Sequence, residues 1–125
     1  MNAYVKSMTE HYAVAALWSS LDWNGMDDPD GNPDPLDDNY AVDDIDAETY
    51  AAMSADCQAF YDANRDDIGD MSPEQCGHDF WLTRNGHGAG FWDRGLGERG
   101  KRLSAAARVY GEVDLFTLNG KVYAQ

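Results

Sequence analysis

The chain has little cysteine and no long apolar run, and both absences narrow its class. Its two cysteines, Cys57 and Cys76, form no CxxC pair. This excludes a dense disulfide scaffold and favours a reducing compartment, while leaving a single bridge between them open. The longest apolar stretch, residues 13–18, is far too short to span a membrane, and the N-terminus lacks the features of a signal peptide. We therefore expect a cytoplasmic protein.

Basic residues are nearly absent from the first part of the chain. Residues 1–75 hold 18 of the 23 acidic residues and only Lys6 and Arg65 as cations, a balance of −16. Residues 76–125 hold seven cations and five anions, a balance of +2. Self-repulsion of this size destabilises a compact state, so charge gathered in one segment indicates a basic partner or a bound cation. The total charge of −14 argues against direct contact with nucleic acid or anionic lipid.

The composition predicts one folded α+β domain over residues 1–125, with three to four helices and a small C-terminal antiparallel β-hairpin or sheet. Four Trp, seven Tyr and four Phe supply a core. Residues 7–21 favour a helix over a strand, although their apolar positions have mixed spacing. Residues 22–46 read as a long acidic loop, because Asp, Pro and Gly are frequent there and Pro29, Pro33 and Pro35 interrupt regular structure.

Capping residues predict where the later elements begin. Asp46 is a good N-cap for a helix whose apolar stripe faces inward and leaves Asp56, Asp62 and Asp66 outside. Ser72, followed by Pro73, starts a short helix to about residue 84, and residues 96–110 again have helical spacing. The dipeptide at 119–120, Asn-Gly, is the strongest short-range signal of a hairpin.

The run from Gly77 to Arg94, GHDFWLTRNGHGAGFWDR, resembles a group of small acidic proteins carried by bacteriophages and related mobile elements. The resemblance extends to Pro35–Tyr40 and Asp43–Asp46. It implies a phage origin, and with it a role in taking over or protecting against host machinery. It assigns no functional residues.

Two alternatives concern metal ions. Cys76, His78, Asp79 and His87 are candidate ligands of a small metal-dependent enzyme or metal-binding protein, but their spacing matches no strong zinc pattern. In the structural interpretation, His78 and Asp79 instead hydrogen-bond a loop held by Phe91 and Trp92. The acidic turn at 28–34 is reminiscent of a weak calcium site, although its glycine and prolines do not fit an EF-hand. We expect no enzyme activity, cofactor or resident metal.

Aromatic residues of the motif have two interpretations. Trp81, Phe91 and Trp92 favour core packing of the glycine-rich loop onto a helix. The alternative is an exposed aromatic anchor in an interface.

The charge is best explained by mimicry of nucleic acid. A folded surface bearing paired carboxylates can occupy the Lys/Arg groove of a DNA-binding protein. We expect this protein to be an inhibitor of the anti-CRISPR or anti-restriction type. Its expected partner is a basic nucleic-acid-binding host protein, such as a restriction enzyme, a CRISPR effector or a nucleoid protein. The remaining alternative is an acidic accessory protein without mimicry. The predicted partner-binding residues are Asp27, Asp28, Asp30, Asp34, Asp37, Asp38, Asp43, Asp44, Asp46, Asp62, Asp66, Asp67 and Asp70.

Overall fold

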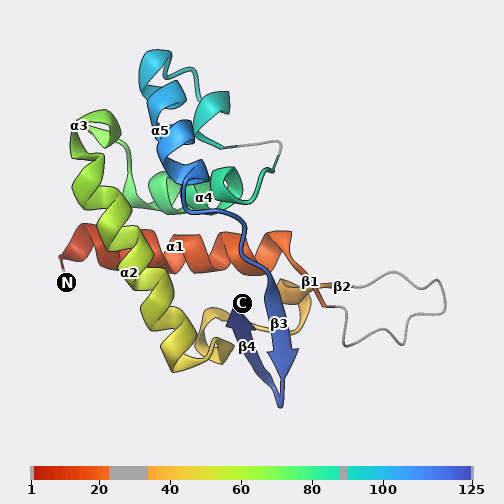
Figure 1. Ribbon diagram of the computed structural model, residues 1–125. Coiled ribbons are helices and arrows are strands. Elements are labelled where there is room, and N and C mark those ends of the chain that lie inside the picture. Colours follow the sequence, from red (N-terminus) through yellow and green to blue (C-terminus); the bar gives the residue numbers. More distant parts are fainter. Residues whose placement is uncertain (1, 23–33, 88–89, 125) are drawn as a thin grey trace.

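The computed structural model describes residues 2–22, 34–87 and 90–124, and it confirms the α+β class (Figure 1). The helices are α1 (Ala3–Ser19), α2 (Ala47–Ala63), the one-turn α3 (Arg65–Ile68), α4 (Pro73–Arg84) and α5 (Glu98–Arg108). The 3-10 turns are η2 (Leu36–Asp38), η3 (Val42–Asp44) and η4 (Phe91–Asp93). The strands are β1 (Leu21–Asp22), β2 (Asp34–Pro35), β3 (Leu115–Leu118) and β4 (Lys121–Ala124).

Helix α1 is the central helix of the domain. It begins at Ala3, earlier than predicted, because the Asn2 side chain accepts a hydrogen bond from the Val5 amide at 2.7 Å and so caps the first turn. Buried side chains lie on several faces of α1, since α4, α2, η2 and η3 all pack against it. A helix covered on several sides loses a clear amphipathic period, which explains the mixed spacing in the sequence.

Helix α4 lies side by side with α1, and the two run in the same direction (Figure 1). Their close approach depends on Gly77, because a Cβ there would collide with the carbonyl oxygen of Met8. The predicted N-cap is confirmed: Ser72 Oγ accepts a hydrogen bond from the Gln75 amide at 3.2 Å. Phe80 from this helix stacks on Phe60 with ring centroids 4.2 Å apart, which joins α4 to α2 in the core.

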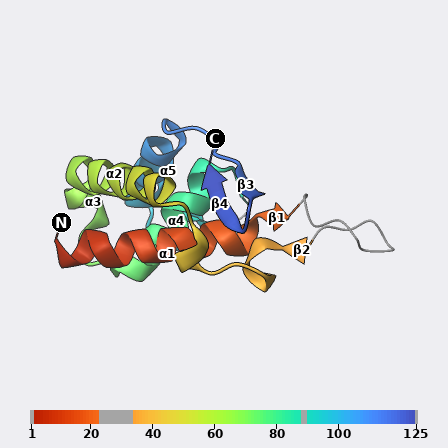
Figure 2. The same ribbon diagram turned by 90° about the horizontal axis from the view of Figure 1, so that it is seen from below.

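Helix α2 crosses α1 at the front of Figure 1. Asp46 caps it as predicted, since its carboxylate accepts a hydrogen bond from the Thr49 amide at 3.1 Å. The buried side chains of the predicted stripe are Met53, Cys57 and Phe60. Seen from below, α2, α5 and the β3–β4 hairpin lie on one side of α1 (Figure 2).

The C-terminal hairpin is confirmed. Its two turn residues, Asn119 and Gly120, have φ values of 53° and 81°, the left-handed conformation that a type I′ turn requires. Strand β4 also forms a parallel bridge with Ile45, and the Asp46 amide donates to the Val122 carbonyl at 2.8 Å. The hairpin therefore holds the segment that leads into α2.

The described part of the 22–46 segment is more regular than the sequence predicts. Leu21 and Asp22 pair with Pro35 and Asp34 in a short antiparallel ladder, and η2 and η3 follow. Leu36 is buried, and its amide donates to the Ser20 carbonyl at 2.9 Å, so one apolar side chain anchors this segment to the end of α1. Pro29 and Pro33 lie outside the described residues.

Candidate acidic interface

The predicted partner-binding residues lie in different parts of the fold. Asp27, Asp28 and Asp30 fall outside the described residues, and Asp34 is described only as part of the β1–β2 ladder. The other nine residues lie in two regions, one around η2 and η3 and one where α2 leads into α3.

The first region precedes and begins α2. The exposed carboxylates here form what we call the η2–η3 acidic group: Asp37, Asp38, Asp43 and Glu48. Asp44 and Asp46 belong to the same region but are engaged by the backbone. Asp44 accepts a hydrogen bond from the Ala41 amide at 2.9 Å, and Asp46 is the cap of α2.

The second region contains three exposed carboxylates, which we call the α3 acidic group: Asp62, Asp66 and Asp70. Asp67 lies beside them but forms a bidentate pair with Arg102, with Nη2 to Oδ1 at 2.7 Å and Nε to Oδ2 at 3.0 Å. The hydrogen bonds from Arg102 lower the pKa of the Asp67 carboxyl. Arg99 donates to the carbonyls of Asp67 and Ile68, so these contacts fasten α3 to α5.

The two acidic groups lie at opposite ends of α2, the yellow end and the green end in Figure 1. Seventeen residues of helix correspond to about 25 Å at roughly 1.5 Å per residue. Between the groups the helix exposes small side chains, including Ala51, Ala55 and Ala59. The exposed members of the predicted set therefore lie in two separated regions, with a helix face of small side chains between them.

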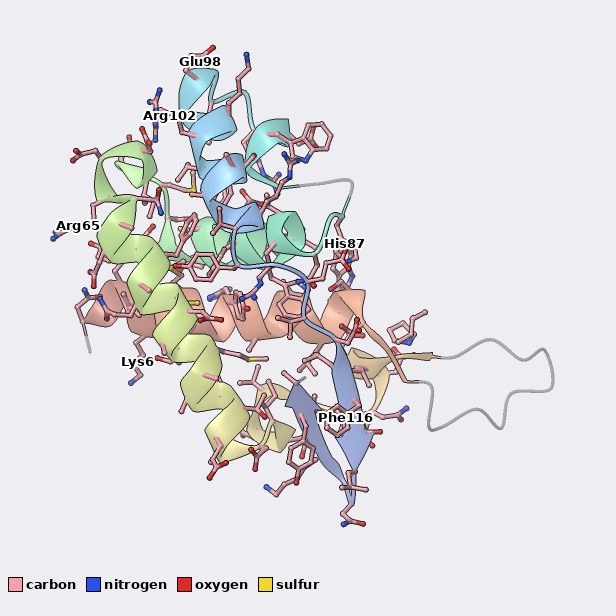
Figure 3. The ribbon with its side chains drawn as sticks, in the orientation of Figure 1. Lys6, Arg65, His87, Glu98, Arg102 and Phe116 are labelled. Carbon is pink, nitrogen blue, oxygen red and sulfur yellow. The ribbon has the colours of Figure 1, made fainter. Side chains whose placement is uncertain are left out.

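Cations do little to offset this charge. Lys6 points down from α1 and Arg65 points outward at the start of α3 (Figure 3). Most arginines of the second half are occupied within the fold, since Arg84, Arg94 and Arg102 each pair with a carboxylate. The charge asymmetry of the sequence therefore persists on the surface of the described residues.

Arg84 is the main polar contact that sequence reasoning missed. Its side chain is 4% exposed; Nη1 lies 2.9 Å from Asp56 Oδ2 and 3.0 Å from the Tyr12 hydroxyl oxygen. Nε and Nη2 donate to the carbonyls of Gly111 and Tyr110 at 2.8 and 2.9 Å. Asp56 is 41% exposed, so the expectation that it lies outside holds only in part: this partner, 28 positions away in the sequence, binds its carboxylate.

Two hydrogen-bonded contacts within the motif at 77–94 attach its glycine-rich end to α4. The Asp79 carboxylate is fully buried and accepts a bidentate pair from Arg94, with Nη2 to Oδ1 at 2.8 Å. The Thr83 hydroxyl accepts from the Phe91 amide at 3.2 Å, and Gly90 leaves room for it, because a Cβ there would collide with that hydroxyl. The structural interpretation of Asp79 is thus confirmed.

The aromatic residues of the motif divide between the two interpretations. Trp81 and Phe91 are buried, as core packing requires. Trp92 is 51% exposed, so the expectation that it packs in the core is wrong. It follows directly after the buried Phe91 in the 3-10 turn η4, which leaves no second inward position. His78 lies beside exposed Trp18, with ring centroids 5.9 Å apart.

The four candidate metal ligands of the motif do not converge. Burial raises the pKa of the Cys76 thiol to about 12, Asp79 is paired with Arg94, and His87 is exposed. Within the described ranges no group of three or more His, Cys, Asp and Glu side chains is placed to hold a metal ion. Cys57 and Cys76 are both buried free thiols. The calcium-like turn at 28–34 lies almost wholly outside the described residues.

In the part of the chain that the structure describes, no helix has both the length and the apolar character needed to cross a membrane. Comparison of the chain with protein-family models, curated proteins and solved structures gives no match. Function is therefore inferred from the surface of the described residues.

Proposed function

We propose that this protein is an acidic inhibitor that occupies the nucleic-acid-binding groove of a basic host protein. The observation that carries the proposal is the pair of exposed acidic groups at the two ends of α2; Arg102, the cation beside the α3 acidic group, is already paired with Asp67. A Lys/Arg groove draws most of its affinity for DNA from the phosphate field, and a carboxylate surface supplies a field of the same sign.

The geometry suits a protein that spans such a groove. About 25 Å separates the ends of α2, which is somewhat less than one helical turn of B-DNA at roughly 34 Å. Asp44, Asp46 and Asp67 are engaged within the fold, so the exposed members of the two acidic groups are the residues that would meet the partner. The resemblance of residues 77–94 to phage proteins adds the expectation that the target is a bacterial defence or nucleoid protein.

The test is capture of a partner from bacterial lysate at salt concentrations from about 50 to 500 mM, with duplex DNA as competitor. We expect recovery of a nucleic-acid-binding protein that is lost as salt rises and is displaced by the duplex. Capture that is insensitive to both salt and DNA, or no capture at any salt, would overturn the proposal.

Three charge-neutralising variants sharpen this experiment because each removes three negative charges. D37N/D38N/D43N changes the η2–η3 acidic group, D62N/D66N/D70N changes the α3 acidic group, and D93N/E112Q/D114N is the control in the second half of the chain. All nine side chains are exposed. We expect each of the first two variants to weaken binding at least tenfold at low salt, since three phosphate-like contacts contribute steeply to salt-dependent affinity. Equal losses in all three variants would show an effect of net charge alone.

A further inference from the structure

A groove opens between α1 and the first half of α2, next to the η2–η3 acidic group. Its volume is about 720 Å³. Lys6, which points down from α1 in Figure 3, is one of the residues that line this groove. The apolar wall comes from Val14 on α1, Val42 on η3, and Ala47 and Tyr50 on α2.

The groove exposes apolar surface on a protein that is otherwise strongly charged. Val14 is 48% exposed, although it lies on a helix whose other valine, Val5, is fully buried. Ala47 and Tyr50 also border a second hollow of about 440 Å³, which continues along α2 past Ala51 and Ala55. The apolar surface is thus a strip on α2 that ends in a groove, and contiguous exposed patches of this kind typically mark interaction sites.

Charge at the groove selects the chemistry of its occupant. Glu10 and Asp43 lie at the groove with exposed carboxylates, and the basic side chains among its described lining residues are Lys6 and His11. Glu10 and Tyr50 line the same groove; burial raises the pKa of the Tyr50 hydroxyl, and the negative charge of Glu10 raises it further. Glu48 comes from α2, which borders the groove, whereas Asp37 and Asp38 lie on η2, which contributes no lining residue.

We propose that this groove binds an apolar side chain flanked by lysine or arginine on the basic partner. The inference rests on the proposed function and adds a site to it. A negative rim attracts the flanking cations, while the apolar wall removes the side chain between them from water. Duplex DNA offers no equivalent of that second contact, so the groove would distinguish one basic protein from another where charge alone would not.

Two synthetic peptides of about 15 residues test this inference. One places leucine and lysine at helical spacing, and the other replaces every leucine with glutamine, so that both have the same charge. We expect the leucine peptide to bind about tenfold more tightly, the effect of burying roughly one large aliphatic side chain. That preference should persist at about 500 mM salt, whereas the affinity common to both peptides should fall. Backbone amide shifts should locate the difference at Val14, Val42 and Tyr50.

Val14→Gln is the matching variant, and Val109→Gln is its control, because Val109 is 85% exposed and lies at the end of α5. We expect V14Q to lose most of the preference for leucine and V109Q to keep it. Equal affinity of the two peptides, or no binding of either, would overturn the proposal that the groove binds an apolar side chain. A preference for leucine that V14Q leaves intact would also overturn the proposal. A dimer of the protein that V14Q abolishes would overturn it too, because the groove would then bind a second copy of the chain.

The two proposals fail separately. A partner whose capture depends on salt and is competed by DNA, and which binds V14Q and the unchanged protein with equal affinity, would support mimicry and contradict the groove as a binding site. A leucine preference that V14Q abolishes, without any DNA-competed partner, would keep the groove and reject mimicry.

Discussion

Arg84 is the residue on which the interior depends most directly. Its guanidinium joins α4 to Tyr12 on α1, to Asp56 on α2, and to the backbone carbonyls of Tyr110 and Gly111. A buried guanidinium is stable only when its donors are satisfied, and here each of the three nitrogens has an acceptor. The half-exposed Asp56 leaves one side of this cluster open to water.

Replacing Arg84 with methionine should destabilise the fold by about 3 kcal/mol, because it leaves two inward-facing carbonyls and the Tyr12 hydroxyl without their donor. Urea unfolding followed by circular dichroism measures this loss. Arg108→Met is the control, since Arg108 is exposed, and it should change stability by no more than about 0.5 kcal/mol. Equal effects of the two substitutions would show that the Arg84 contacts contribute no net stability.

At the scale of elements, the contact between α1 and α4 organises the domain. Gly77 lets the two backbones approach, and Trp81 donates to the Ser19 hydroxyl at 2.7 Å near the other end of the pair. The pair carries three of the core aromatics, Tyr12, Phe80 and Trp81, while α2 packs on α1 and α5 packs on α4. The contacts between Asp79 and Arg94, and between Thr83 and Phe91, then attach the segment after α4 to the same helix.

Gly77→Ala should therefore destabilise the protein by about 3 kcal/mol or more, because the added methyl group meets backbone atoms of α1 that cannot move aside alone. Thermal unfolding measures the effect. Gly95→Ala is the comparison: Gly95 has φ 68° and open space around it, so only backbone strain of about 1 to 2 kcal/mol applies. A stabilised G77A variant would show that helix propensity outweighs the close approach, and the inferred packing of α1 on α4 would be wrong.

For the whole molecule, charge is the dominant property. The chain carries a net charge of −14, and two groups of exposed carboxylates from its first half lie at the two ends of α2. The cations of the second half offset this only locally, since Asp67 with Arg102 and Asp56 with Arg84 are contacts between the two halves. The halves attract at these points while the remaining acidic surface repels itself.

Screening should therefore stabilise the free protein. Raising sodium chloride from about 10 to 200 mM shortens the screening length from roughly 30 Å to below about 8 Å. We expect the thermal midpoint to rise by about 3 to 6 °C, which corresponds to about 1 kcal/mol for a domain of this size. D37N/D38N/D43N should show a smaller rise than the unchanged protein. A midpoint that falls with salt would mean that the ion pairs between the halves outweigh the repulsion.

The sequence by itself determined the helix starts and the hairpin turn, because these features depend only on residues that are close together in the chain. Asp46 and Ser72 mark helix starts because a cap acts within one turn, and Asn119-Gly120 marks the hairpin because its turn needs two residues with positive φ. The charge asymmetry, and with it the expectation of a basic partner, is likewise present in the composition.

Only the tertiary structure decided which carboxylates remain unpaired on the surface and which form ion pairs with arginine. Asp56 and Asp67 lie in runs that look as solvated as Asp62 or Asp66, yet arginines 28 and 35 positions away engage them. The groove beside Tyr50 is also a tertiary product, because its walls come from α1, η3 and α2. Such pairings depend on how helices cross in space, and helical periodicity reports only which face of a helix is apolar.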